Sequence, residues 1–221
     1  MKLKTVLILS VISLSVFLIY LATLDHKVYY LDLGDEISVG ENAYGKQLER
    51  YFSSLNKLEQ YIDGFKEEDL RITDLIRNIE TNQKIMLGKK EQTLKNALIK
   101  ADLVTLSLGR NDFVYKIDYM SKSELYDTAD QVLHDLEDLF TLMREYCKED
   151  IIFIGIINSN WPAQDEVFLY LNEKINRICE EYDILFYLPE HADMIEGHLT
   201  EESNAPFYEG LKVLVDENLL K

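Results

Sequence analysis

The chain has 221 residues, and its 40 acidic and 23 basic side chains give it a formal net charge of −17 at pH 7. A surface of this sign repels nucleic acid and anionic lipid headgroups, so a function that depends on tracking phosphate groups is excluded. The length suits one domain that follows a short N-terminal segment. Cys147 and Cys179 lie in helical patterns, so we expect two buried free thiols rather than a disulfide.

The N-terminal segment is apolar. Residues 5–24 contain no charged side chain, and Lys2 and Lys4 precede them. A run of about 20 apolar residues is long enough to cross a bilayer as a helix, and the two lysines favour a cytoplasmic N-terminus. We therefore expect residues 1–24 to be a cytoplasmic N-terminus and transmembrane signal anchor, and residues 25–221 to form one domain outside the cell membrane.

The alternative is a signal peptide that is removed from the mature protein. Signal peptides have a shorter apolar core of about 7–15 residues and end in an Ala-x-Ala-like pattern. The sequence Ala22-Thr23-Leu24 fits that pattern poorly, so a single-pass membrane protein is the favoured interpretation.

After the anchor, strand-like and helix-like patterns alternate. The apolar, β-prone runs are residues 28–33, 57–62, 102–108, 151–157 and 184–188. Apolar side chains at helical spacing fall within residues 44–55, 72–79, 94–98, 122–148, 167–178 and 211–218. Strands separated by helices of this length predict right-handed crossovers, and hence an α/β domain with a parallel sheet.

The turns that follow two of the predicted strands carry sequences that are typical of a catalytic or ligand-binding site. The first strand stops at Gly-Asp-Glu, residues 34–36, and the third stops at Gly-Arg-Asn-Asp, residues 109–112. Open α/β sheets place their ligands at the carboxyl ends of the strands, so these two turns are the candidate site.

The two sequences resemble blocks of the SGNH, or GDSL, hydrolases, in which Gly-Asp-Ser follows the first strand and Gly-x-Asn-Asp a later one. The resemblance implies a three-layer α/β/α fold with a flavodoxin-like parallel sheet of about five strands. In that family a serine attacks an ester carbonyl, a histidine takes its proton and an aspartate orients the histidine. Backbone N–H groups of the serine and of a glycine, with the asparagine side chain, form the oxyanion hole.

The resemblance places the cleft around Gly34, Asp35, Gly109, Asn111 and Asp112. It implies that Asn111 donates a hydrogen bond to an oxyanion and that Asp112 braces its turn. The plain alternative is that these two side chains only cap a loop.

The catalytic positions of the family are replaced in this chain. Glu36 stands at the serine position, and Asp69 stands at the oxyanion glycine. Residues 206–210 resemble the segment after the family's histidine, which places Ala205 at the histidine and Ser203 at the aspartate. We therefore expect no hydrolase activity.

A rearranged site is the alternative. Ser38 lies two residues after Glu36, but two residues move a side chain several ångströms, so we expect Ser38 to be structural. His198 lies in the loop before the last helix, where an isolated histidine is more often solvated. Glu36 itself would need a partner acid about 5–5.5 Å away to act as a glycosidase nucleophile, and the sequence identifies none.

The acidic side chains of the cleft, Asp35, Glu36, Asp112 and Asp69, are of the type that binds hard cations. In the resembled family, however, the aspartate at position 35 serves the hydrogen bonds of its own turn. We expect no metal and no cofactor.

The favoured function is a non-catalytic binding or scaffold domain at the cell envelope. The expected partner is a cell-envelope glycan, an acyl group or a membrane protein, and not nucleic acid. The enzymatic alternative is an esterase or acyl-hydrolase that acts on lipid or cell-wall esters. A scaffold would use the long acidic helix at residues 122–148, on which an exposed apolar patch would mark the partner's surface.

Overall fold

The structure is a computed structural model that describes residues 27–40, 42–113, 117–157, 165–189, 192, 194–195 and 198–220. The expected anchor at residues 1–24 lies outside these ranges. Within them, no helix is both long enough and apolar enough to span a membrane.

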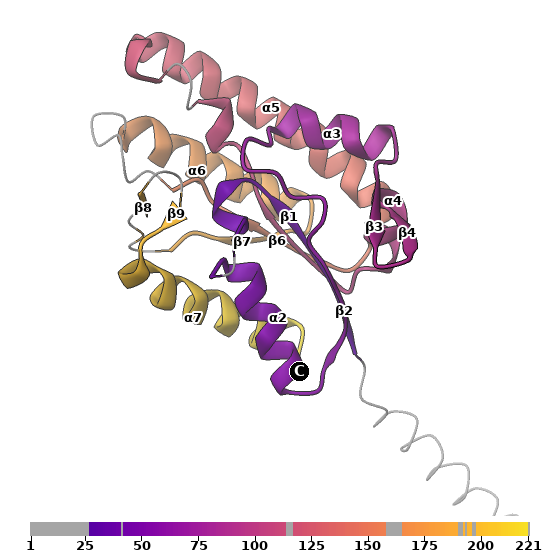
Figure 1. Cartoon of the computed structure of the whole chain (residues 1–221). Helices are drawn as coiled ribbons and strands as arrows, with labels where there is room; N and C mark the ends of the chain where they lie inside the picture. Colours follow the sequence, from indigo (N-terminus) through magenta and orange to yellow (C-terminus); the bar gives the residue numbers. More distant parts are fainter. Residues whose placement is uncertain are drawn as a thin grey trace, which may run out of the picture.

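Five parallel strands form the central sheet, as predicted (Figure 1). From one side to the other, their order is β2 (Leu58–Ile62), β1 (Val28–Gly34), β5 (Leu103–Ser107), β6 (Asp150–Ile154) and β7 (Leu185–Tyr187). Every neighbouring pair is parallel, so all five strands end at the same edge of the sheet. β1 is buried along its whole length because it has a strand on either side and helices over both faces.

Helices cover both faces of the sheet, which gives three layers (Figure 1). One face carries α2 (Tyr44–Ser54) and α7 (Glu201–Asn218), and the other carries α3 (Ile72–Glu80), α4 (Leu94–Lys100), α5 (Lys122–Tyr146) and α6 (Asp165–Glu181). The alternating side chains of β1 divide between the two cores: Leu31 and Leu33 belong to the core of α3 to α6, and Tyr30 belongs to that of α2 and α7. The predicted α/β/α architecture is confirmed.

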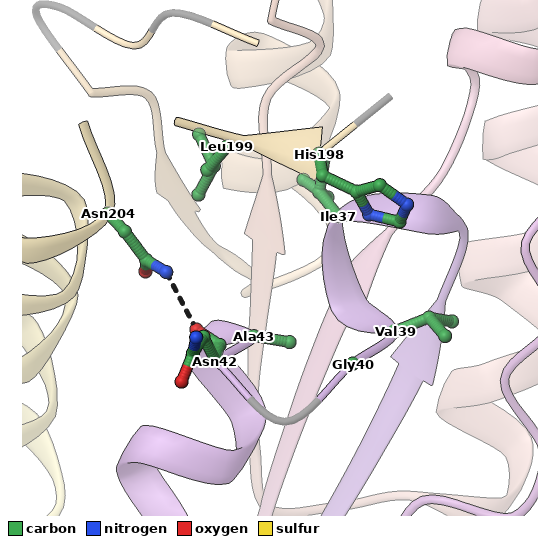
Figure 2. Close-up of a pocket in the computed structure, with 8 residues that line it drawn as sticks. All are labelled: Ile37, Val39, Gly40, Asn42, Ala43, His198, Leu199 and Asn204. Carbon is green, nitrogen blue, oxygen red and sulfur yellow. Dashed lines mark hydrogen bonds between the residues drawn. The ribbon is translucent and has the colours of Figure 1, made fainter. Parts of the chain in front are cut away.

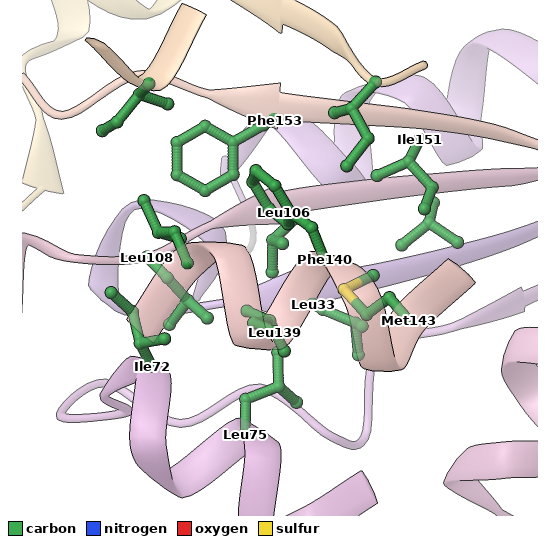
Figure 3. Close-up of a cluster of buried hydrophobic side chains, with 14 of the residues drawn as sticks. Leu33, Ile72, Leu75, Leu106, Leu108, Leu139, Phe140, Met143, Ile151 and Phe153 are labelled. Atoms are coloured by element: carbon green, nitrogen blue, oxygen red, sulfur yellow. The ribbon is translucent and has the colours of Figure 1, made fainter. Parts of the chain in front are cut away.

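The larger core lies between the sheet and helices α3 to α6. Figure 3 shows Leu106 and Phe153 of the strands beside Leu139 and Phe140 of α5. The rings of Phe140 and Phe153 meet edge to face with their centroids 5.5 Å apart. Cys147 and Cys179 are buried in the same core as free thiols, as expected.

The structure contains two hairpins that were not predicted from the sequence. β3 (Lys84–Leu87) pairs with β4 (Lys90–Thr93), and β8 (Met194–Ile195) pairs with β9 (His198–Leu199). These strands are only two to four residues long and β4 is polar throughout, so the hairpins give too little alternation to be recognised from the sequence.

The last helix begins earlier than its apolar spacing indicates, at Glu201. The Oγ1 of Thr200 accepts a hydrogen bond from the Ser203 N–H group at 3.2 Å, which caps the first turn. Pro206 therefore lies inside the helix rather than ahead of it, and Ala205 lies on the helix too.

Gly45 of α2 packs against the carboxylate of Asp32 in β1. Replacing a helical glycine with alanine normally stabilises a protein by about 0.5–1 kcal/mol. Here a Cβ atom would overlap Oδ2 of Asp32 and lie 2.5 Å from its Cγ. We expect Gly45→Ala to lower the free energy of unfolding by about 1–3 kcal/mol, as measured by urea denaturation. A stabilised variant would contradict this packing.

Candidate functional site

The ends of β1 and β5 lie side by side. Gly34 and Ser107 are paired in register, and the Asp35 N–H group donates a hydrogen bond to the Ser107 carbonyl at 3.0 Å. Gly34 has a φ of 147°, and a Cβ there would lie 2.6 Å from the Ser107 carbonyl oxygen. Only glycine allows this approach, which brings the two candidate turns together.

Each strand continues into a short 3-10 turn, η1 (Glu36–Ser38) after β1 and η2 (Arg110–Asp112) after β5. The Nη1 of Arg110 and the Oε1 of Glu36 form an ion pair between these turns. Their side chains are only 10% and 9% exposed, and among the described residues the Oε2 of Glu36 has no hydrogen-bond partner. Glu36 is the residue that the sequence resemblance matches to the family's serine.

The sequence predicts no role for Arg110, although a carboxylate at a buried turn indicates that a cation must lie nearby. A carboxylate in a buried position needs a paired cation to remain charged. Arg110, at the variable position of the Gly-x-Asn-Asp sequence, supplies that cation for Glu36.

Asp35 and Ser38 serve the turn in which they lie. The Oδ1 of Asp35 accepts a hydrogen bond from Ser107 Oγ at 3.2 Å. Burial, and then the neighbouring Glu36 carboxylate, raise the pKa of Asp35 well above its ordinary value. The buried Ser38 hydroxyl donates to the Asp35 carbonyl at 2.7 Å, and this commits the hydroxyl that a rearranged esterase would need.

A buried ion pair holds the η1 turn from beneath. The Nζ of Lys66 donates to Oδ2 of Asp32 at 2.8 Å and to the Ser38 carbonyl at 2.5 Å. The hydroxyls of Thr105 and Tyr61 donate to the same carboxylate at 2.8 and 3.0 Å. Burial raises the pKa of Asp32, and the Lys66 ammonium is the main opposing influence. Sequence reasoning missed both members of this pair.

The Asn111 side chain is held by two backbone carbonyls. Its Nδ2 donates to the Glu68 carbonyl at 2.9 Å and to the Leu70 carbonyl at 3.1 Å. An amide nitrogen has two hydrogens, so neither remains for an oxyanion in this arrangement. Gly109, with a φ of 105°, supplies the left-handed residue at the start of the η2 turn.

The other residues matched to family positions lie elsewhere. Asp69 is exposed and lines a shallow depression with Arg71, Thr73 and Asp74, and the carbonyls of its neighbours Glu68 and Leu70 accept the hydrogen bonds of the Asn111 amide. Ser203 is buried and Ala205 exposed in the first turns of α7. Among the described residues, no group of three or more His, Cys, Asp and Glu side chains is arranged to hold a metal ion.

The loop before α7 instead brings His198 to the η1 turn. Its Nδ1 lies 3.2 Å from the carbonyl oxygen of Glu36. A carbonyl only accepts hydrogen bonds, so Nδ1 carries a proton, and the Nε2 of the neutral ring is left as an acceptor. His191, the other histidine of this segment, lies outside the described residues.

An open pocket of about 320 Å³ lies beside His198 (Figure 2). Its walls are Ile37, Val39, Gly40, Asn42, Ala43, His198, Leu199 and Asn204. The Nδ2 of Asn204 donates to the Asn42 carbonyl at 2.8 Å, and its Oδ1 accepts from Gln47 at 2.6 Å. The cavity beside Asp35 and Arg110 is only about 10 Å³, room for a single water. Space for a ligand therefore lies at His198 and not at the Glu36 carboxylate.

Asp112 gives this region a pH-dependent stability. Burial raises the pKa of Asp112 to about 6, and its Oδ2 has no hydrogen-bond partner among the described residues. Such a carboxyl stabilises the folded chain below its unfolded pKa, near 4, and loses that contribution as the pH rises through about 6.

We expect the stability of Asp112→Asn relative to the wild-type chain to increase with pH. Between about pH 4 and about pH 7.5, the difference in their free energies of unfolding should grow by about 2 kcal/mol in favour of the variant. The amide keeps the shape of the side chain but has no charge to bury. Urea denaturation at the two pH values measures the gain, and a difference that is independent of pH would contradict it.

No protein-family model and no curated protein sequence matches the chain. Solved structures do match. The lipase Lip_vut3 from a goat rumen metagenome is 14% identical, with a TM-score of 0.66 over 83% of this chain and 95% of that one. The acetylxylan esterase Axe2 from Geobacillus stearothermophilus is 15% identical, with a TM-score of 0.58 over 85% and 94%. The acetyl xylan esterase AlAXEase is 14% identical, with a TM-score of 0.60 over 84% and 99%. Catalytic mutants of Axe2 carry alanine in place of a serine or an aspartate.

Proposed function

We propose that this chain, which has the fold of the SGNH-hydrolase-type esterases, is a non-catalytic binding domain held at the cell envelope by residues 1–24. The buried ion pair between Glu36 and Arg110 is the observation that carries the proposal. A carboxylate held by a guanidinium is a poor nucleophile, and the pair fills the turn on which this fold presents its attacking group.

The hydrogen bonds of the neighbouring side chains support the same proposal. Ester hydrolysis by a serine needs a free hydroxyl, a base and donors for the oxyanion. The Ser38 hydroxyl is bound to a backbone carbonyl, and both amide hydrogens of Asn111 are bound as well. His198 could serve as a base, but the described residues that line its pocket include no hydroxyl for it to activate.

The pocket beside His198 supports binding as the task of the domain. Its apolar walls, its carboxamides and the acceptor nitrogen of His198 suit an uncharged ligand with hydroxyl groups. Axe2 and AlAXEase are named for their action on acetylated xylan, so an acylated glycan of the cell envelope is the ligand class we propose.

A fluorophosphonate probe and a 4-nitrophenyl ester test the absence of catalysis on the full chain in detergent. We expect neither labelling nor turnover above that of buffer, with an active acetylxylan esterase as the positive control. Wild-type labelling or turnover that Ser38→Ala or His198→Ala abolishes would overturn the proposal.

The second candidate is an active esterase or acyl-hydrolase with a rearranged site. His198 favours it, because the bond from Nδ1 to the Glu36 carbonyl leaves Nε2 available as a base beside the pocket. The same assay decides between the two functions, since this one requires turnover that depends on His198.

A further inference from the structure

The parallel sheet gives the domain two opposite edges. All five strands begin at one of them, and the turns with Glu36 and Asn111 lie at the other (Figure 1). We call the first the anchor edge, defined by the four lysines that precede strands β1, β2, β5 and β6: Lys27, Lys57, Lys100 and Lys148. The second is the cleft edge.

Backbone contacts bring the anchor-edge segments together. The Val28 N–H group donates to the Lys57 carbonyl at 2.6 Å, and the Asp102 N–H group donates to the Tyr29 carbonyl at 2.9 Å. Asp150, which starts β6, is in register with the first residue of β5. The four lysines therefore belong to one side of the domain.

The cleft edge is acidic. Glu67, Glu68 and Asp69 follow β2 and are exposed, and the Glu67 N–H group donates to the Gly34 carbonyl at 3.3 Å, beside the candidate site. Glu202 is exposed in the first turn of α7.

The balance of charge differs between the two edges. At the cleft edge, Lys66 and Arg110 are buried in ion pairs, so they do not offset the exposed acids. At the anchor edge, the four lysines are mixed with acids: Asp102, Glu149 and Asp150 lie beside them, and the exposed Glu180, Glu181 and Asp183 precede β7. The cleft edge therefore carries an unbroken run of exposed acids, Glu67 to Asp69, whereas the acids of the anchor edge are interspersed with lysines.

The anchor edge also exposes apolar side chains beside its lysines. Leu55 is 42% exposed two residues before Lys57, and Ile99 is 62% exposed next to Lys100. Apolar side chains flanked by lysines are typical of surfaces that lie at a membrane interface.

We propose that the anchor edge rests on the anionic headgroups of the membrane that holds residues 5–24, so that the cleft edge faces away from the bilayer. This inference rests on the anchor in the proposed function. Residues 25–27 span at most about 10 Å, which keeps the start of β1 at the membrane surface. The seven residues of β1 then carry the η1 turn about 23 Å from that point.

Charge opposes the inverted orientation. A domain lying with its cleft edge down would press Glu67, Glu68 and Asp69 against anionic headgroups, which repel them. In the proposed orientation these acids stand farther from the surface than the screening length of about 8 Å, and the lysines lie within it. The ligand of the pocket then arrives from the aqueous side and not from the bilayer.

Energy transfer in vesicles tests the orientation. The full chain is reconstituted in phosphatidylcholine with phosphatidylglycerol as the anionic lipid, and an impermeant maleimide donor is attached at Ser53→Cys, at the end of α2, or at Glu68→Cys. A headgroup-labelled lipid is the acceptor, and the wild-type chain reports background labelling of its two buried cysteines. We expect transfer at least about twofold higher from position 53, because the two sites stand at opposite ends of the strands.

Charge reversal tests the role of the lysines. The triple variant Lys57→Glu/Lys100→Glu/Lys148→Glu should lower the transfer from position 53. The matched control makes the same change of charge on the outer helices, at Lys122, Lys174 and Lys212, and should leave the transfer unchanged.

Equal transfer from the two labelled positions, or higher transfer from position 68, would overturn the inference. So would a chain that separates from the vesicles on flotation, since the anchor would then be wrong. Neither result affects fluorophosphonate labelling. The proposed orientation can therefore be wrong while the proposed absence of catalysis is right, and the reverse.

Discussion

Lys66→Met is expected to lower the free energy of unfolding by about 3–5 kcal/mol. The substitution removes the cation from a pair whose side chains are 6% and 0% exposed, and it leaves the Asp32 carboxylate in the interior without its charge partner. The hydrogen bond to the Ser38 carbonyl is lost as well, so the turn that carries Glu36 is held less firmly. Urea denaturation near neutral pH measures the loss.

The size of this loss should depend on pH. The Lys66 ammonium opposes the rise that burial causes in the pKa of Asp32, so removing it raises that pKa further. A carboxyl with a raised pKa stabilises the fold below its unfolded pKa and loses that contribution as the pH rises through its folded value. The deficit of Lys66→Met should therefore be smaller at about pH 5 than at about pH 8.

An exposed lysine provides the matched control. Lys122 pairs with Glu166 at 2.6 Å, but the two side chains are 69% and 74% exposed. Lys122→Met should leave the denaturation midpoint unchanged, because exposed pairs are screened by water. Equal midpoints for Lys66→Met and the wild-type chain would contradict the importance of the buried pair.

Arg110→Met is expected to cost a similar amount, about 3–5 kcal/mol of unfolding free energy. Its ion pair borders the cleft, yet both side chains are almost fully buried. Without the guanidinium, Glu36 would hold a buried charge, and its Oε2 already lacks a hydrogen-bond partner among the described residues. Urea denaturation of the single variant measures the loss.

The double variant Arg110→Met/Glu36→Gln separates the cost of an unpaired Glu36 charge from the cost of losing the packing of the Arg110 side chain. Removing the carboxylate charge should restore about 2 kcal/mol or more of what Arg110→Met loses. If the two substitutions are additive, the side chains are not coupled, and the ion pair does not stabilise the turn.

The sheet could be predicted because its strands are buried on both faces. Residues 151–154 of β6 form an unbroken apolar run, as expected where helices cover both sides. The polar strand β4 gives no such signal. The start of α7 depends on one capping hydrogen bond, which Thr200 accepts from the Ser203 N–H group. Pro206, in contrast, suggests a helix boundary five residues too late.

The meeting of the two site turns was also predictable, because neighbouring parallel strands end at one edge. The ion pairs were not. Glu36 and Arg110 are 74 positions apart, and Asp32 and Lys66 are 34 apart. The chain has 40 acidic and 23 basic residues, and the sequence alone does not show which of them are close in space.

The two hydrogen bonds of Asn111 limit what a serine at position 36 could do. Glu36→Ser would place a hydroxyl beside an amide that already holds the Glu68 and Leu70 carbonyls. Releasing those carbonyls would cost about 1–3 kcal/mol for each one left buried and unpaired. One amide cannot fasten the loop that leads into α3 and serve a transition state at the same time. Turnover that uses Asn111 as an oxyanion donor would therefore require that loop to adopt another arrangement, and a single substitution at position 36 does not supply one.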